Sequence, residues 1–189
     1  MSFTNFFKYL IPVALFAGLP SLGLADSHGG LDPKDAVGIS FWIISIAMVA
    51  ATAFFFLESL RFSGKWRTSM VVGGLVTLVA AVHYFYMRDV WASGGGSPTV
   101  YRYVDWIVTV PLQMVEFYLI LAACTAVAGG VFWRLFLGSL VMLIAGYLGE
   151  AGMINATIGF VVGIAGWLYI LYEIFAGEAG KVSAADAPA

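Results

Sequence analysis

Ionisable side chains interrupt one long apolar stretch of the chain, RYVDWIVTVPLQMVEFYLIL, which runs from Arg102 to Leu121. Asp105 and Glu116 lie eleven residues apart in it. On a helix this spacing places them within roughly 20° of each other and about 16 Å apart along the axis. Ionisable groups at membrane depth are costly, so they indicate a functional site. Two carboxyl groups on one stripe of a membrane helix predict a path for protons.

The same stripe carries further polar groups. Arg102, Thr109 and Gln113 fall within roughly 80° of it on a helix. Asp105, three residues after an arginine, is expected to stay ionised and to accept a proton. The sequence neighbours of Glu116 are apolar, which favours its neutral form, able to donate a proton. Environments that differ in this way divide acceptor from donor.

A histidine is expected at the depth of Asp105. His83 precedes Trp91 by eight residues, and Asp105 follows Pro98 by seven. Measured from the same side of a membrane, these positions are about 12 Å and 10 Å deep. We therefore expect His83 beside Asp105, although packing or a contact between subunits would also explain a membrane histidine.

The remaining polar candidates have simpler explanations. Glu58, Arg88 and Glu150 lie near the ends of apolar segments and are expected to be interfacial anchors. The only cysteine, Cys124, has apolar neighbours and is expected to be a small buried residue. A single thiol forms neither an intrachain disulfide nor a zinc cluster, and we predict no metal site.

The composition predicts an all-α, polytopic membrane bundle. Of 189 residues, 61% are hydrophobic and 11% charged, and the mean hydropathy is +0.94. Soluble domains are about half apolar and a quarter charged. A net charge of -2 gives no reason to expect nucleic acid as a partner. Each apolar segment is near the length that crosses a bilayer; the five predicted spans are 37–60, 68–91, 98–124, 131–150 and 155–176.

The two ends of the chain differ from this bundle, which we assign to residues 26–176. Residues 1–25 resemble a cleaved signal peptide, because an apolar run ends in the small-x-small sequence Gly23-Leu24-Ala25. A retained N-terminal helix is the alternative. Residues 177–189, GEAGKVSAADAPA, are expected to form a flexible polar linker.

Basic residues predict the orientation. The first connection carries Arg61, Lys65 and Arg67, and the third carries Arg134. By the positive-inside rule both connections are cytoplasmic. The mature N-terminus is then outside and the end of the chain inside.

Several motifs resemble one family. The Arg102–Leu121 segment is similar to the third helix of the proteorhodopsins, members of the microbial rhodopsins. HYFYM (His83 to Met87), GYLGEAG (Gly146 to Gly152) and LYILYEIFAGE (Leu168 to Glu178) resemble the neighbouring helices. The likeness runs from about Leu31 to Glu178 and implies a seven-helix fold, of which this chain has five helices. It also implies a light-driven outward proton pump with retinal as chromophore, protons as cargo and a ring-shaped homo-oligomer. The surroundings it implies are the lipid bilayer of a bacterial inner (cell) membrane.

The resemblance assigns roles to the stripe. Asp105 would be the counter-ion of the retinal Schiff base and its proton acceptor, and Glu116 the donor that reprotonates it. Thr109 would lie between them. His83 would adjust the proton affinity of Asp105, and Arg102 would polarise the outer side.

The resemblance also implies a retinal pocket. Gln113 stands where blue-absorbing members carry Gln and green-absorbing members Leu, so a blue-absorbing type is expected. The residues expected to line the pocket are Tyr84, Trp106, Thr109, Gln113, Met142, Gly146, Phe160 and Trp167.

One departure from the family is large. In the family, retinal is bound to a lysine of the seventh helix, whereas Lys8, Lys34, Lys65 and Lys181 all lie outside the predicted spans. We therefore interpret the chain as an N-terminal five-helix portion that alone should not pump. The alternatives are a truncated, non-photoactive membrane protein or an oligomerisation partner. A light sensor is disfavoured by Glu116 and by the lack of a signalling domain.

Overall fold

The structure is a computed structural model that describes residues 32–94 and 97–185. Within these residues every regular element is a helix. Five of the segments are long and apolar enough to cross a membrane, with the last two helices counted together. The predicted all-α membrane bundle is thus confirmed. The helices are α2 (Ala36–Ser59), α3 (Gly64–Ala92), α4 (Thr99–Cys124), α5 (Gly129–Glu150), α6 (Ala156–Phe175) and α7 (Glu178–Ala185).

The predicted spans agree closely with these bounds. The largest difference is at the start of α3, predicted at 68 and observed at Gly64. The added turn contains Lys65 and Arg67, so it does not belong to an apolar run, yet it continues the helix. The expected signal peptide, residues 1–25, lies outside the described residues.

The structure differs from the prediction after residue 177. Residues 178–185, expected to be part of a linker, form α7. Glu178 lies in the first turn, where a negative charge is favourable to a helix, and it pairs with Arg134 of α5 at 2.5 Å. Ala179 is completely buried. This short helix therefore contacts the bundle through the Glu178–Arg134 ion pair, the buried Ala179 and a hydrogen bond from the Ala179 N–H to Glu173.

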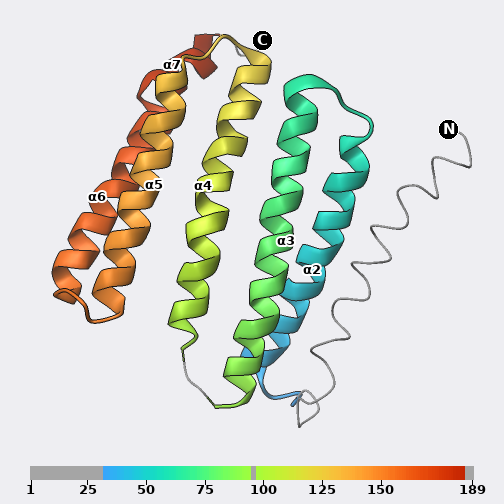
Figure 1. Cartoon of the computed structure of the whole chain (residues 1–189), viewed down its shortest axis with the longest axis vertical. Helices are drawn as coiled ribbons and strands as arrows, with labels where there is room; N and C mark the ends of the chain where they lie inside the picture. The colour runs from blue at the N-terminus through green and yellow to red at the C-terminus, as the bar shows by residue number, and fades with distance from the viewer. Residues whose placement is uncertain (1–31, 95–96, 186–189) are drawn as a thin grey trace, which may run out of the picture. The chain divides into compact units, whose positions relative to one another are not determined.

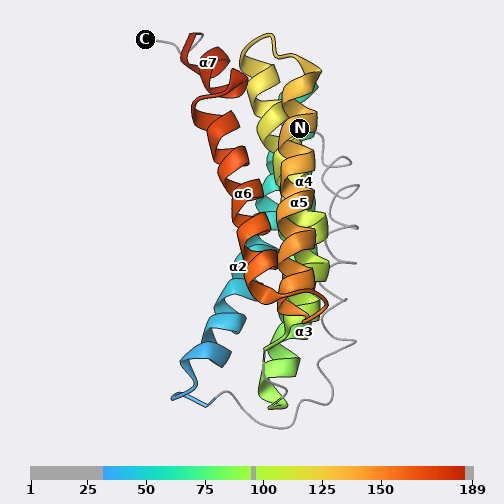
Figure 2. The same ribbon diagram turned by 90° about the vertical axis from the view of Figure 1, so that its left-hand side faces the viewer.

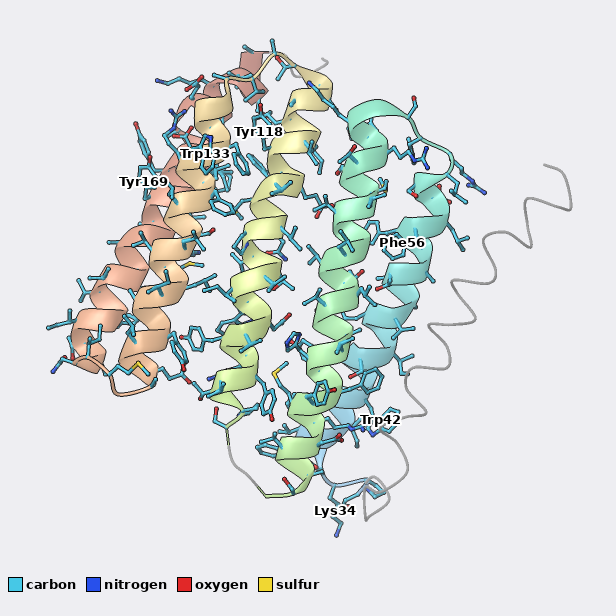
Figure 3. The ribbon with its side chains drawn as sticks, in the orientation of Figure 1. Lys34, Trp42, Phe56, Tyr118, Trp133 and Tyr169 are labelled. Atoms are coloured by element: carbon cyan, nitrogen blue, oxygen red, sulfur yellow. The ribbon has the colours of Figure 1, made fainter. Side chains whose placement is uncertain are left out.

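Consecutive helices pack side by side and antiparallel, as Figures 1 and 2 show for α5 and α6. These two approach closely, because Gly159 of α6 lies against the backbone of Gly149 on α5. On the other side, α2 contacts α3: Thr52 Oγ1 donates to Thr77 Oγ1 at 2.9 Å. The ring of Phe56, labelled in Figure 3, lies on Gly74.

An apolar core lies where α4 ends and α5 begins, which we call the Cys124 end; the opposite side of the bundle is the Thr99 end. The buried residues of this apolar core come from α4, α5, α6 and α7, so the core joins four helices at the Cys124 end. Near it, Tyr118 of α4 meets Phe132 of α5, with ring centroids 5.8 Å apart (Figure 3). The buried members are Leu121, Val131, Leu135, Ile170 and Ala179.

Candidate functional site

The structure brings His83 and Asp105 together. The two residues lie on α3 and α4, and His83 Nδ1 is 3.7 Å from Asp105 Oδ1. The ring also makes a 2.9 Å contact from Nδ1 to the carbonyl of Val79, which assigns the proton to Nδ1. Only 3% of Asp105 is exposed, and its Oδ1 has no hydrogen-bond partner among the described residues. A buried carboxyl oxygen in this position is open to a cationic or proton-donating group.

Thr109 lies one turn further along α4. Its Oγ1 donates to the backbone carbonyl of Asp105 at 3.0 Å, and the side chain is buried. This hydrogen bond lies within α4, and Asp105 Oδ1 stays without a hydrogen-bond partner among the described residues. Asp105 and Thr109 are thus both buried, one helical turn apart on α4.

Glu116 and Gln113 have different surroundings. Glu116 is half-buried and faces α3, where its Oε1 lies so close to Gly73 that an added Cβ would be 2.9 Å away. Gln113 is exposed. Of the predicted polar stripe, Asp105, Thr109 and Glu116 are therefore buried or half-buried, whereas Gln113 is exposed.

Arg102 reaches Glu150 at the end of α5. It forms an ion pair with Glu150, and the Thr99 hydroxyl donates to the same carboxylate at 3.0 Å. Its guanidinium also lies 5.6 Å from the ring centroid of Trp106. Glu150, expected to be only an interfacial anchor, is thus the partner of Arg102. The sequence contains no signal for this pair, because the rotation of α4 against α5 decides it.

Two other expectations are corrected. Arg88, predicted as an interfacial anchor, is only 6% exposed; it pairs with Asp89 at 2.8 Å, and its guanidinium lies 4.4 Å from the ring centroid of Trp42. An arginine satisfied by a carboxylate and an aromatic face can be buried. Cys124, predicted to be buried, is exposed, because it is the last residue of α4.

The expected pocket residues fall into two groups. Between α4 and α5, Trp106 meets Tyr103 edge-on with centroids 5.2 Å apart, and the Tyr103 hydroxyl lies against Gly146. A side chain larger than glycine would displace this tyrosine.

The other pocket candidates have different recorded neighbours. Tyr84 is near Phe41 of α2, with centroids 6.1 Å apart. Met142 lies with its backbone against Gly166 of α6. Phe160 and Trp167 are 65% and 46% exposed, so the described residues do not enclose them.

Two of the lysines lie within helices. Lys65 is the second residue of α3, and Lys181 lies in α7, so both belong to helical segments longer than the predicted spans. The ammonium group of Lys65 donates to the carbonyl of Ala122 at 2.6 Å. Ala122 is seventeen residues beyond Asp105, about 25 Å along α4, so Lys65 is remote from the acid.

Comparisons with known proteins identify the family of the chain. The sequence profile of bacteriorhodopsin-like proteins matches residues 35–189. The blue-light absorbing proteorhodopsin of Gamma-proteobacterium Hot 75m4 is 52% identical over 180 residues, which cover 95% of this chain and 70% of that protein. The green-light absorbing proteorhodopsin of Gamma-proteobacterium EBAC31A08 is 50% identical over 182 residues, covering 96% and 72%.

A solved structure is similar as well. The crystal structure of blue light-absorbing proteorhodopsin from Med12 matches with a TM-score of 0.67 and 53% identity, over 78% of this chain and 70% of that one. Fold and site together define a multi-pass helical membrane protein with a buried aspartate and a half-buried glutamate on one helix. The chain belongs to the bacteriorhodopsin-like family, and the predicted resemblance to the proteorhodopsins is confirmed.

Proposed function

We propose that this protein, in its complete form, is a light-driven, outward proton pump of the proteorhodopsin type and not an enzyme. The observation that carries the proposal is the buried carboxyl group of Asp105, which lies 3.7 Å from His83 and has an oxygen without a hydrogen-bond partner among the described residues. Relatives at about 50% identity named as light-absorbing proteorhodopsins support it.

The family implies a retinal chromophore. Residues of α4 and α5 suit its pocket, whereas the predicted spans of this chain contain no lysine to which it could be attached. The free oxygen of Asp105 suits the cationic end of such a group. Gly146 leaves room beside Tyr103 that a Cβ would fill. When bound, retinal supplies light absorption and a light-induced change of shape. The residues proposed to line its site remain Tyr84, Trp106, Thr109, Gln113, Met142, Gly146, Phe160 and Trp167.

The chain's own residues divide the work of moving a proton. Asp105 holds a negative charge at the centre of the bundle and takes up the proton. His83 adjusts how readily it does so, and Arg102, held by Glu150, adds positive charge toward the Thr99 end. Glu116, on the Cys124 side of Asp105, delivers the replacement proton.

An absorption spectrum tests the chromophore. Membranes that contain the protein in its complete form receive all-trans retinal and then hydroxylamine. A visible band in the blue that hydroxylamine bleaches is expected, since Gln113 is the residue of blue-absorbing members. Absorbance of free retinal alone would contradict covalent attachment and leave a dark membrane protein or an oligomerisation partner as the function.

Replacing the acceptor tests the pump. Asp105→Asn removes the negative charge with little change of shape, so illumination should no longer acidify the medium outside vesicles or cells. Asp89→Asn is the matched control, because Asp89 is partly exposed and pairs only with Arg88 among the described residues. Unchanged acidification in Asp105→Asn would remove Asp105 from the acceptor role.

A further inference from the structure

The contacts between α3 and α4 follow one antiparallel register. Lys65 contacts Ala122, Gly73 lies against Glu116, and His83 faces Asp105. In an antiparallel pair of helices, residues at the same depth have a nearly constant sum of residue numbers. The three pairs add to 187, 189 and 188, so one axial alignment of α3 and α4 accounts for all three contacts. A shift at either end would therefore move both acids of α4 relative to α3.

Lys65 holds the Cys124 end of this register. Its Nζ donates to the carbonyl oxygen of Ala122 at 2.6 Å. The last four carbonyl groups of a helix have no partner within the helix, and a positive charge is favourable there. Ala122 lies in this last turn of α4, which ends at Cys124. Lys65 thus caps α4 from the neighbouring helix.

Glu116 lies further from the Cys124 end of α4 than Ala122, the residue that Lys65 caps. Ala122 follows Glu116 by six residues, about 9 Å along α4. On α3, Gly73 follows Lys65 by eight residues, about 12 Å along the axis. Nothing larger than glycine fits at Gly73 without moving the Glu116 carboxyl group. The position of this carboxyl group therefore depends on the alignment that Lys65 anchors.

The other cations of this end are engaged differently. Arg61 pairs with Glu58 at 3.0 Å, and Arg134 pairs with Glu173 at 3.0 Å and with Glu178. Arg67 is exposed and two residues beyond Lys65, which turns it about 200° around α3. It carries the same charge at the same end but faces away from the α3–α4 contact.

We propose that Lys65 is a positioning residue for Glu116. By holding the Ala122 carbonyl, it keeps α4 aligned with α3 and the Glu116 carboxyl group seated against Gly73, at the end from which Glu116 takes up its proton. The role in proton uptake rests on the proposed function, whereas the anchoring of α4 does not.

A spin label tests the anchor without light or retinal. Cys124 is the only cysteine of the sequence, is exposed and lies two residues beyond Ala122. Lys65→Met keeps the aliphatic stem and removes the donor, so a label on Cys124 should become more mobile in lipid vesicles. Lys65→Arg should restore the ordered spectrum, and Arg67→Met should leave it unchanged. Equal spectra for Lys65→Met and the unsubstituted protein would overturn the anchor.

Flash photolysis of the retinal-loaded protein with a pH-sensitive dye tests the positioning role. In Lys65→Met, proton uptake through Glu116 should slow by roughly tenfold, the factor expected when a charge-assisted hydrogen bond is lost. Proton transfer to Asp105 should keep its rate, because this acid lies about 25 Å from Ala122 along α4.

The outcomes separate the possibilities. A mobile label with unchanged proton uptake would overturn the positioning role. Equal slowing of uptake and of transfer to Asp105 would overturn it too, because it would indicate a general loss of structure. An unsubstituted protein that moves no protons in light would remove the proposed function and the uptake role with it, while the label result would still decide the anchor.

Discussion

Glu116 differs from Asp105 in how much of the carboxyl group the protein encloses. Asp105 is buried beside His83, whereas Glu116 is half-buried against Gly73. Glu116 has no charged partner within 4 Å among the described residues. A half-buried acid without such a partner can exchange protons with the nearby surface and still hold one. This arrangement suits a residue that is loaded again in every cycle.

Glu116→Gln should therefore slow the pump without blocking its first step. Gln cannot release a proton, so uptake should slow by roughly 10²-fold or more, the range typical when a proton-transfer group is lost. Transfer to Asp105 should remain. Flash photolysis with a pH dye measures both. Glu58→Gln is the control, because Glu58 lies at the same end and pairs with Arg61; equal rates in both variants would contradict the donor role.

Some residue contacts follow from the sequence and others do not. The depth of His83 and Asp105 could be counted from the ends of their helices, and the two do meet. The pairing of Arg102 with Glu150, 48 residues apart, could not, because counting gives depth along a helix but not its rotation toward a neighbour. The same limit hid the contact of Lys65 with Ala122.

At the scale of elements, α5 and α6 are joined by two different means. Gly159 and Gly166 of α6 bring the helix backbones into contact. At the Cys124 end, Arg134 of α5 reaches the carboxyl group of Glu173, which is only 3% exposed. Glu173 also accepts from the backbone N–H of Ala179 on α7, at 3.4 Å. The apolar spans predicted α5 and α6, whereas α7 depends on these tertiary contacts and was missed.

Gly159→Ala should destabilise the α5–α6 pair. The added Cβ would lie 2.7 Å from the Cα of Gly149 and 2.8 Å from the carbonyl oxygen of Ala145. Both are backbone atoms, so the helices must separate, at a cost of about 1–3 kcal/mol. Thermal unfolding in detergent, followed by circular dichroism, measures the effect.

Gly129→Ala is the matched control for that substitution. Gly129 is the first residue of α5, and a Cβ there meets nothing within 4 Å. Alanine favours a helix over glycine by up to about 1 kcal/mol, so this variant should unfold at the same temperature or slightly higher. Similar losses in Gly129→Ala and Gly159→Ala would show that helix propensity, and not the close approach of the backbones, decides the result.

At the scale of the whole molecule, the two ends of the bundle differ in charge. The Cys124 end carries five basic residues, Arg61, Lys65, Arg67, Arg134 and Lys181, within residues 40–185. The Thr99 end carries two in the same range, Arg88 and Arg102, and each pairs with a carboxylate. Basic residues in short loops stay preferentially in the cytoplasm. We therefore propose that the Cys124 end is cytoplasmic and that Glu116 is loaded from that side.

The native cysteine makes this orientation testable. Cys124 is exposed at the end that we propose to be cytoplasmic, so a thiol reagent that cannot cross membranes should label it in broken membranes but not in intact spheroplasts. A second variant, Cys124→Ser with Met153→Cys, moves the thiol to the connection between α5 and α6, where Met153 is 64% exposed. That thiol should react in intact spheroplasts. The reverse pattern would mean that Glu116 faces the outside, and a chain with this order of acids would then have to carry protons inward.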